Sequence, residues 1–342
     1  TSYTVSPLSY LNPDDIESIT VLKDADQVTI YGADGSNGVI LVTTKSGTKN
    51  KPLAVSARVN FGVATIDKST EFRMMSQKQY LEVAKEAWVN AGKNLNTFPY
   101  QDNDYNSYST TDTDWSKEYF GVGTNLYADL SLTSGTDKLS NYVTGSYYRT
   151  NNTVKGDSQQ RFSFRTRNTY DFTNWLKVNA QLSASYNDND LFPLYRGYLE
   201  TLPILEPYMS DGSFRLYNKV YEVDKGGWTM RKFTKNEVPD REANTNRQRS
   251  VVTSANFSAE VKIIDGLKFT AQYAIDYTHS HEDIYYSRMT LDGKDSAGNP
   301  KGSSRRADAS YMNWTNVERL NFDRKFADRH SVSAYAGIEL RQ

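Results

Sequence analysis

The chain has no cysteine, which excludes disulfide bonds, thiolate metal sites and a thiol nucleophile. It also lacks any run of about 18 consecutive apolar residues, the length that a membrane-spanning helix requires. Its 40 lysines and arginines are balanced by 41 aspartates and glutamates, so there is no basic excess of the kind that binds nucleic acid. Composition thus excludes several classes of protein but does not indicate the fold, which has to be inferred from the order of the residues.

That order is an alternation of apolar and polar residues over stretches of about ten positions. From 176 to 187, apolar residues take every even position and polar residues every odd one. A period of two is typical of a β-strand with one face in an apolar medium and the other in water. We predict nine such strands, at residues 53–66, 122–133, 140–150, 161–172, 176–187, 250–262, 267–278, 311–324 and 330–341.

The connections between these strands alternate in length. TSGTDKL, TNW, IDG and KFADR are short turns, whereas the gaps at 67–121, 151–160, 188–249 and 279–310 are longer. In an up-and-down barrel every second connection lies on the same side of the membrane, which explains both alternations together. The sequence therefore predicts an all-β fold, a transmembrane antiparallel up-and-down β-barrel. Because nine is an odd number of strands, we interpret the chain as a fragment of a larger barrel.

The apolar stripe makes a mutational prediction. If Ala180 faces lipid near the bilayer midplane, Ala180→Arg should cost roughly 2–4 kcal/mol, and Gln181→Arg on the opposite face should be nearly neutral. A soluble β-domain, which remains an alternative, would show no such difference and would dissolve without detergent.

The first 50 residues have a different character. Asn12 and Pro13 fit the cap and first position of a single helical turn, and short strands are expected near 19–22 and at Val39–Thr44. Three glycines, Gly32, Gly35 and Gly38, mark an irregular turn before the second strand. Their spacing is not that of a phosphate-binding loop, so we interpret them as serving backbone shape.

Two patterns of carboxylate and histidine residues are candidates for metal sites. Asp102, Asp104 and Asn106 have the spacing of a calcium loop, but Ser107 stands where the loop needs glycine and Thr113 where it needs a bidentate glutamate. A solvated surface loop is the favoured interpretation.

The second pattern is His279 and His281 beside Glu282 and Asp283, near the predicted end of a strand. Two histidines and a carboxylate can hold a metal ion, but rim residues are favoured here because no further ligand is evident. No histidine lies in a recognisable nucleophile setting, so the sequence predicts no enzyme, no metal site and no cofactor.

The stretch LNPDDIESITVLKDADQVTIYGADGSNGVILVTTKSG resembles the plug domain of SusC-type (RagA-type) TonB-dependent outer-membrane transporters of Bacteroidota. The resemblance continues through RMMSQKQYLEVAKEAW, TDWSKEYF, LSLTSGTDKLSNYVTGSYYRTNNTVKG, the hairpin RFSFRTRNTYDFTNWLKVNAQLSASY and the closing DRHSVSAYAGIEL. It makes residues 1–50 the C-terminal part of a plug domain and residues 51–342 the N-terminal part of a barrel. Asp34 departs from the family, which usually has arginine there, and Asp26 replaces a small residue.

The resemblance implies a barrel of about 22 strands with an α+β plug inside it, integral to the outer membrane and surrounded by lipid. The implied function is TonB-dependent active import of a large nutrient, an oligosaccharide or a peptide, with a SusD-type surface lipoprotein as lid. TonB would bind upstream of this chain. A non-transporting surface assembly component, whose loops bind a partner, is the alternative. The plug motif consists of Tyr31, Gly32, Gly35, Asn37 and Gly38, the glycines for backbone shape and the other two for local hydrogen bonds.

One helix is expected, at residues 75–88, where Tyr80, Leu81, Ala84 and Trp88 follow helical spacing. Packing against the barrel wall or its loops is favoured over contact with a partner lipoprotein. Aromatic residues in the long loops fit either sugar stacking or the packing of a large loop. They are Trp115, Tyr119, Tyr195, Tyr198, Tyr217 and Trp228.

Overall fold

The computed structural model describes residues 12–24, 28, 35–67, 74–98, 100, 111–192, 201–215, 218–224, 227–233, 236, 238–290, 292–295, 299–326 and 330–342. Within them, none of the helices has the length and apolar character needed to cross a bilayer.

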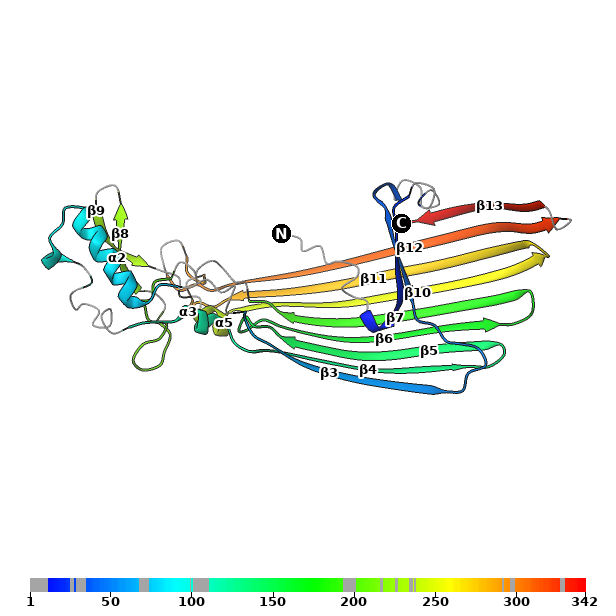
Figure 1. Cartoon of the computed structure of the whole chain (residues 1–342), viewed down its shortest axis with the longest axis horizontal. Coiled ribbons are helices and arrows are strands. Elements are labelled where there is room, and N and C mark those ends of the chain that lie inside the picture. Colours follow the sequence, from blue (N-terminus) through cyan, green and yellow to red (C-terminus); the bar gives the residue numbers. More distant parts are fainter. Residues whose placement is uncertain are drawn as a thin grey trace.

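One nine-stranded antiparallel sheet forms most of the molecule, and strands that follow one another along the chain lie side by side in it (Figure 1). The strands are β3 (Ala54–Ala64), β4 (Gly123–Gly135), β5 (Leu139–Asn151), β6 (Ser158–Asp171), β7 (Leu176–Asp190), β10 (Thr245–Ile264), β11 (Leu267–Tyr286), β12 (Ser303–Phe326) and β13 (His330–Arg341). The predicted all-β, up-and-down architecture is confirmed. Closure of the sheet into a complete barrel stays a prediction.

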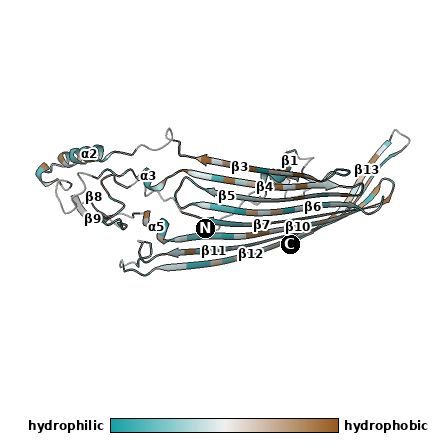
Figure 2. Ribbon diagram, turned by 90° about the horizontal axis from the view of Figure 1, so that it is seen from below, coloured by the Kyte–Doolittle hydropathy of each residue, from teal (hydrophilic) through white to brown (hydrophobic). Residues whose placement is uncertain are grey.

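The register aligns the predicted stripes across the sheet. Phe164 pairs with Ala184, and the next pair, Arg165 with Ser183, points to the opposite face. We call the face with the apolar stripes the outer face and the opposite one the inner face. Figure 2 shows the alternating hydropathy along the strands. Large apolar side chains of the outer face are widely exposed, Val59 at 70% and Phe162 at 50%, as expected for a surface that faces lipid rather than water.

The two ends of the sheet differ as predicted. The short turns lie together at one end, on the right in Figure 1, and the long connections gather at the other. The turn between β10 and β11 is closed by Gly266, whose φ of 86° lies in the left-handed region that favours glycine.

The strands near the long connections are longer than predicted. β10 begins at Thr245, β11 continues to Tyr286 and β12 begins at Ser303, several residues beyond the apolar stripes. Cross-strand hydrogen bonds between charged side chains replace apolar contacts there. A hairpin of β8 (Asn218–Asp224) and β9 (Gly227–Phe233) inside the 188–249 gap was not predicted, although the run Asp-Lys-Gly-Gly at 224–227 is a turn signal.

The N-terminal segment forms a separate small unit on the inner face. A 3-10 turn, η2 (Pro13–Asp15), is capped by the Asn12 side chain, which accepts a hydrogen bond from the Asp14 backbone at 3.1 Å. β1 (Ile16–Leu22) then pairs antiparallel with β2 (Val39–Thr44). The predicted cap and both predicted strands are confirmed, the first strand being longer than expected.

The long connections pack into an apolar unit that we call the loop cluster. It includes α2 (Gln77–Asn90), η4 (Leu95–Thr97), α3 (Trp115–Tyr119) and α5 (Val238–Ala243). Ser76 and Gln79 form a capping box that sets the start of α2, two residues later than predicted. The helix packs on loops, as favoured. The buried apolar residues of the cluster are Ala84, Trp88, Phe98, Tyr100, Trp115, Tyr119, Ile204, Leu205 and Val238.

Candidate functional site

The inner face of the sheet meets the N-terminal segment through buried polar side chains. Asp15 of η2 is 5% exposed, and on the wall Tyr142 of β5 and Arg165 of β6 are 5% and 4% exposed. Buried charges of this kind are expensive unless they are paired. We call this contact the dock, defined by Asn12, Asp14, Asp15 and Thr44 on the segment and Arg58, Tyr127, Tyr142, Arg165 and Arg167 on the wall.

Two tyrosines of the wall hold the helical turn. The Tyr142 hydroxyl donates a hydrogen bond to Asp15 Oδ1 at 3.0 Å, and the Tyr127 hydroxyl donates to Asn12 Oδ1 at 3.0 Å. Asn12 thus serves both the cap of η2 and the wall, so the fold of the turn and its attachment depend on the same side chain.

Two arginines of β6 hold the adjacent end of β2. Arg165 donates to the Thr44 hydroxyl and, at 3.5 Å, to the Asp15 carbonyl oxygen, while Arg167 donates to the Thr44 carbonyl oxygen at 3.2 Å. Ile16 and Thr44 are the paired ends of β1 and β2. The two arginines therefore bind the end of the small sheet at which β1 begins, β2 ends and the helical turn lies.

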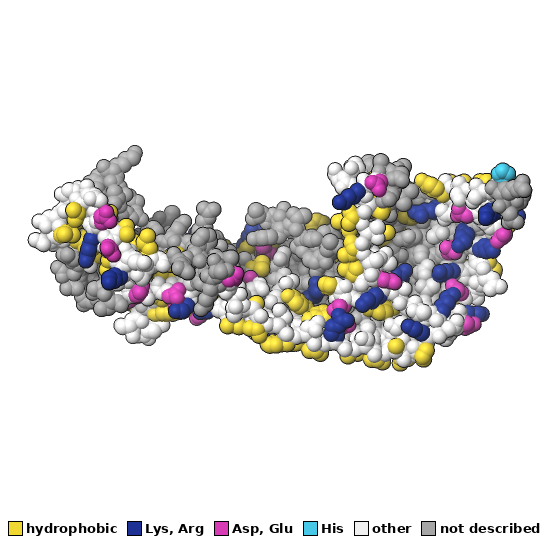
Figure 3. All heavy atoms as spheres, viewed as in Figure 1, with side chains coloured by type: hydrophobic (Ala, Val, Ile, Leu, Met, Phe, Trp, Pro, Cys, Tyr) yellow, Lys and Arg dark blue, Asp and Glu magenta, His cyan; other side chains and the backbone are white. Residues whose placement is uncertain are grey.

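Ion pairs add to the contact between the segment and the wall. Asp14 pairs with Arg58 of β3, and further along the chain Lys49 pairs with Asp171 of β6. On the face seen in Figure 3, basic and acidic side chains are interspersed over the part of the sheet nearest the short turns. Within the dock, however, the carboxylates belong to the segment and the guanidinium groups to the wall.

Burial raises the pKa of the Asp15 carboxyl, because the charged form loses its hydration. The Tyr142 hydrogen bond and the charges of Arg165 and Lys45 oppose that rise. Opposing contributions of this kind leave a buried polar contact with a modest net stability, since desolvation offsets much of the attraction. The chemistry of the dock therefore suits a contact that can be released.

The predicted plug motif is only partly described. Tyr31 and Gly32 lie outside the described residues. Gly38 has a φ of 90°, and its backbone N–H donates to the Gly35 carbonyl oxygen at 2.9 Å. A Cβ at Gly38 would lie 3.1 Å from the Leu22 carbonyl oxygen, so both conformation and space favour glycine there. Gly35 is buried, whereas the Asn37 side chain is exposed and makes no hydrogen bond to a described residue.

The dock itself was not recognised as a site from the sequence. In the sequence, Asp14 and Asp15 fit complements to a helix N-terminus, and Arg165 and Arg167 fit a polar stripe of a strand, so neither pair indicates a contact with the other. The available signal was the density of arginine on a single strand of modest length.

The loop aromatics divide by burial. Trp115 and Tyr119 are each 1% exposed, and the Trp115 indole N–H donates to the Leu202 carbonyl oxygen at 2.9 Å, so these two hold the loops together. Tyr195, Tyr198 and Tyr217 lie outside the described residues, as does the Trp228 side chain. The possible calcium loop at Asp102, Asp104 and Asn106 also lies outside them.

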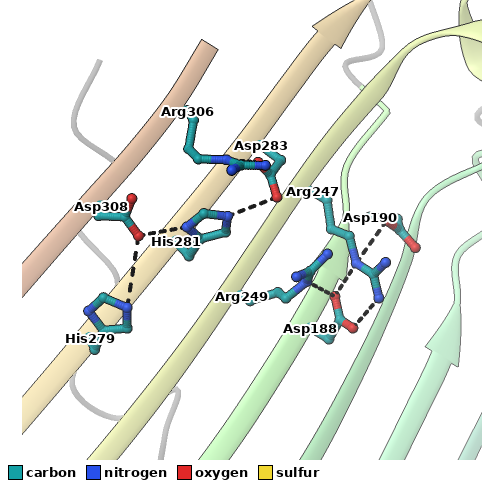
Figure 4. Close-up of polar contacts among 9 residues, drawn as sticks. All are labelled: Asp188, Asp190, Arg247, Arg249, His279, His281, Asp283, Arg306 and Asp308. Atoms are coloured by element: carbon teal, nitrogen blue, oxygen red, sulfur yellow. Dashed lines mark hydrogen bonds and ion pairs between the residues drawn. The ribbon is translucent and has the colours of Figure 1, made fainter. Parts of the chain in front are cut away.

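The two histidines belong to a row of ion pairs on β11 and β12 (Figure 4). His281 lies 2.6 Å from Asp308 and 2.9 Å from Asp283, and His279 Nδ1 lies 2.9 Å from the Ser310 hydroxyl. In the described part of the chain no group of three or more histidine or carboxylate ligands is arranged to hold a metal ion. The histidines take part in cross-strand pairing.

No protein-family model matches the chain. Curated proteins do, and the match extends along nearly all of it. TonB-dependent receptor P26 of Formosa agariphila is 27% identical over 98% of this chain. TonB-dependent receptor SusC of Bacteroides thetaiotaomicron is 32% identical over 46% of it. The chain resembles SusC/RagA-type TonB-dependent receptors.

Solved structures agree on the fold. The chain superposes on the RagAB peptide importer in its open-open state with a TM-score of 0.79, covering 97% of this chain and 39% of that one at 21% identity. The SusC/RagA-type resemblance is thereby confirmed. The chain spans about a third of the length of receptor P26, and its matched part covers 14% of SusC. These relatives are receptors and transporters rather than enzymes.

Proposed function

We propose that the chain is part of a TonB-dependent importer of the bacterial outer membrane, with residues 1–50 in its plug domain and residues 51–342 in its barrel wall. The observation that carries this proposal is the dock. A small separate unit is attached to the wet face of a membrane-type sheet through buried polar groups, with Asp15, Tyr142 and Arg165 at the centre of the contact. Such an attachment suits a plug that must leave its position to open a path.

The plug motif has a shaping role in this proposal. Gly38 gives the turn before β2 its left-handed residue, and Gly35 accepts the hydrogen bond that closes it. We assign Gly32 to the same backbone role, and Tyr31 and Asn37 to local hydrogen bonds within the plug. The motif thus fixes β2, whose last residue, Thr44, is held by the wall.

Cargo and partners follow from the relatives. We propose a large nutrient, an oligosaccharide or a peptide; the RagAB structures are those of a peptide importer. A SusD-type lipoprotein lid would sit over the end of the sheet where the long connections gather, and TonB would act through a segment upstream of this chain.

A reversible crosslink across the dock tests the gating role. In the full-length receptor, Asp14→Cys and Arg58→Cys replace an existing ion pair, and a short bis-methanethiosulfonate can join the two thiols through reducible disulfides, releasing methanesulfinate; this chain has no other cysteine to compete. Import in living cells should stop after crosslinking and return after reduction.

A second cysteine pair is the matched control. Ser146 and Ser163 both lie on the wall, with hydroxyl oxygens 2.7 Å apart, so joining them should leave import intact. Import that continues with the segment joined to the wall would contradict the gating role. Uptake unchanged by deletion of TonB would favour a non-transporting surface component instead.

The outer face has its own test. Ala180→Arg should cost roughly 2–4 kcal/mol of folding free energy in lipid vesicles. Gln181 is not the neutral control that the sequence indicated, because its side-chain oxygen accepts a hydrogen bond from Arg165 at 3.4 Å and a second cation there would be repelled. Gln272→Arg, on the inner face beside Ser258 and Val317, replaces it and should be nearly neutral. Equal costs for the two variants would contradict the assignment of faces.

A further inference from the structure

The outer face is not uniformly filled. A groove of about 650 Å³ crosses β4, β5, β6 and β7, with small residues at its floor and aromatic rings around it. Gly145 and Ala184 belong to the floor, and Tyr147, Phe162 and Phe164 to the walls. A Cβ built at Gly145 would meet nothing nearer than the Ser163 carbonyl oxygen at 4.0 Å, so the space above this glycine is open.

Pairing places the groove directly below a charged row. Tyr147, Phe162, Tyr186 and Val251 are successive partners across four strands and form the groove's upper row. Two residues further toward the long connections, on the same face, the successive partners are Arg149, Gln160, Asp188 and Arg249. The outer face therefore changes from aromatic to charged side chains over two residues of each strand.

The charged row of Arg149, Gln160, Asp188 and Arg249 contains more arginines than carboxylates. Asp188 is buried and bound by Arg247 at 2.7 Å, while Arg249 approaches the same carboxylate only to 3.9 Å, as Figure 4 shows. Arg149 is exposed and forms no ion pair with any described residue. The Asp188 carboxylate is thus already satisfied by Arg247. Arg149, which has no such ion pair, and Arg249, held only by its 3.9 Å contact with Asp188, are the two arginines of these four strands that an outside anion can reach.

We propose that this surface binds one phosphate-bearing acyl lipid of the membrane, with an acyl chain in the groove and a phosphate between Arg149 and Arg249. The groove supplies apolar area, and guanidinium groups are the side chains best suited to phosphate. The order of the two features along β5, Gly145 and Tyr147 followed by Arg149, matches the order of tail and headgroup in a leaflet whose headgroups lie toward the long connections. This binding rests on the proposed function, which places the outer face in lipid.

Lipid retention by the intact receptor tests the groove. Full-length protein in detergent would be equilibrated with phosphatidylglycerol or phosphatidylcholine, and retained lipids counted by native mass spectrometry. The wild type should retain one phosphatidylglycerol in preference to phosphatidylcholine. Gly145→Phe should abolish retention of that molecule, since the ring occupies the open space. Ala180→Phe adds the same ring on the same face outside the groove and should leave retention unchanged.

Charge variants test the headgroup site. Arg149→Gln and Arg249→Gln should each weaken phosphatidylglycerol retention about fivefold, and the double variant about 25-fold, without changing phosphatidylcholine retention. Arg305→Gln is the matched control, because Arg305 is an exposed arginine at the same end of the sheet whose side chain points to the inner face.

Several outcomes would overturn the lipid site. Retention that survives both Gly145→Phe and the smaller Gly145→Leu would do so, as would equal loss in Ala180→Phe or indifference to both arginines. Such results, with Ala180→Arg still costly relative to Gln272→Arg, would remove the lipid site and leave the importer proposal standing. Equal costs of those two arginine variants would remove the membrane assignment itself.

Discussion

The dock and the loop cluster both join remote segments of the chain. The loop cluster does so around buried apolar side chains, and the dock does so through buried polar ones. The loop cluster buries Trp115, Tyr119, Ile204 and Leu205 almost completely, and hydrogen bonds such as that from the Thr113 hydroxyl to the Leu205 carbonyl oxygen accompany this apolar core. The dock buries a carboxylate, a phenol and a guanidinium group and contributes no apolar side chain of comparable burial. Apolar burial adds stability in proportion to area, whereas buried charge largely cancels its own gain. We therefore expect the loop cluster to be a permanent joint and the dock a reversible one.

The largest effect is expected in the permanent joint. Trp115→Ala should cost about 3–5 kcal/mol, because it leaves a cavity and an unpartnered Leu202 carbonyl oxygen. The measurement is hydrogen exchange of the α2 and α3 amides in the full-length receptor. Trp175→Ala, at an exposed position in a short turn, is the control and should change little. Equal effects would mean that the cluster is not held by its apolar core.

Arg165→Gln should weaken the dock by roughly 1–3 kcal/mol, since the carbonyl oxygen of the buried Asp15 and the hydroxyl of the half-buried Thr44 lose their donor. Faster exchange of the β2 amides would report the loss. Arg161→Gln, on the same strand and face but over the Tyr148 ring, should leave those amides unchanged. An Arg165→Gln variant with wild-type exchange would show that the dock does not hold the segment.

Tyr142→Phe removes one hydrogen bond and keeps the ring, so a loss of about 1 kcal/mol is expected at the same amides. Combined with Arg165→Gln it should give less than the sum of the two losses, because both side chains act on Asp15. Strict additivity would mean that the two contacts are independent.

The smallest effect is a pH dependence. The pKa of Asp15 is raised above 3.8 by burial, so the docked state binds the proton more tightly than the released state. Docking should therefore be strongest below pH 3.8 and weaken as the pH rises through the raised pKa. Tyr142, Arg165, Lys45 and Asp129 are the groups that face the carboxyl.

Exchange of the β2 amides, corrected for the intrinsic pH dependence of exchange, measures this trend. Asp15→Asn should abolish it, whereas Asp14→Asn, in the same turn, should preserve it. Weaker docking at low pH would reverse the sign of the effect and contradict it.

The strands of the wall could be predicted from the sequence better than the contacts between remote segments. Residues 176–187 alternate because one face of the strand contacts an apolar medium and the other contacts water. Such a pattern can be recognised within each strand's own sequence, and all nine strands of the sheet were predicted. The ends of β10, β11 and β12 were missed because pairs such as His281 with Asp308 stabilise a strand without an apolar stripe. The dock was missed because Asp15 and Arg165 are 150 residues apart, and no local pattern links them. The roles of Tyr31 and Gly32 stay predictions.

β12 has 24 residues, which at strand geometry is about 80 Å of chain, whereas the apolar band of an outer-membrane barrel is about 25 Å tall. Even with the tilt of a barrel strand, this part of the wall must rise far above the lipid headgroups. In the importer proposed above, cargo would first meet this raised part of the wall, so hydrogen-bonded strands rather than loops would set the height of the entrance.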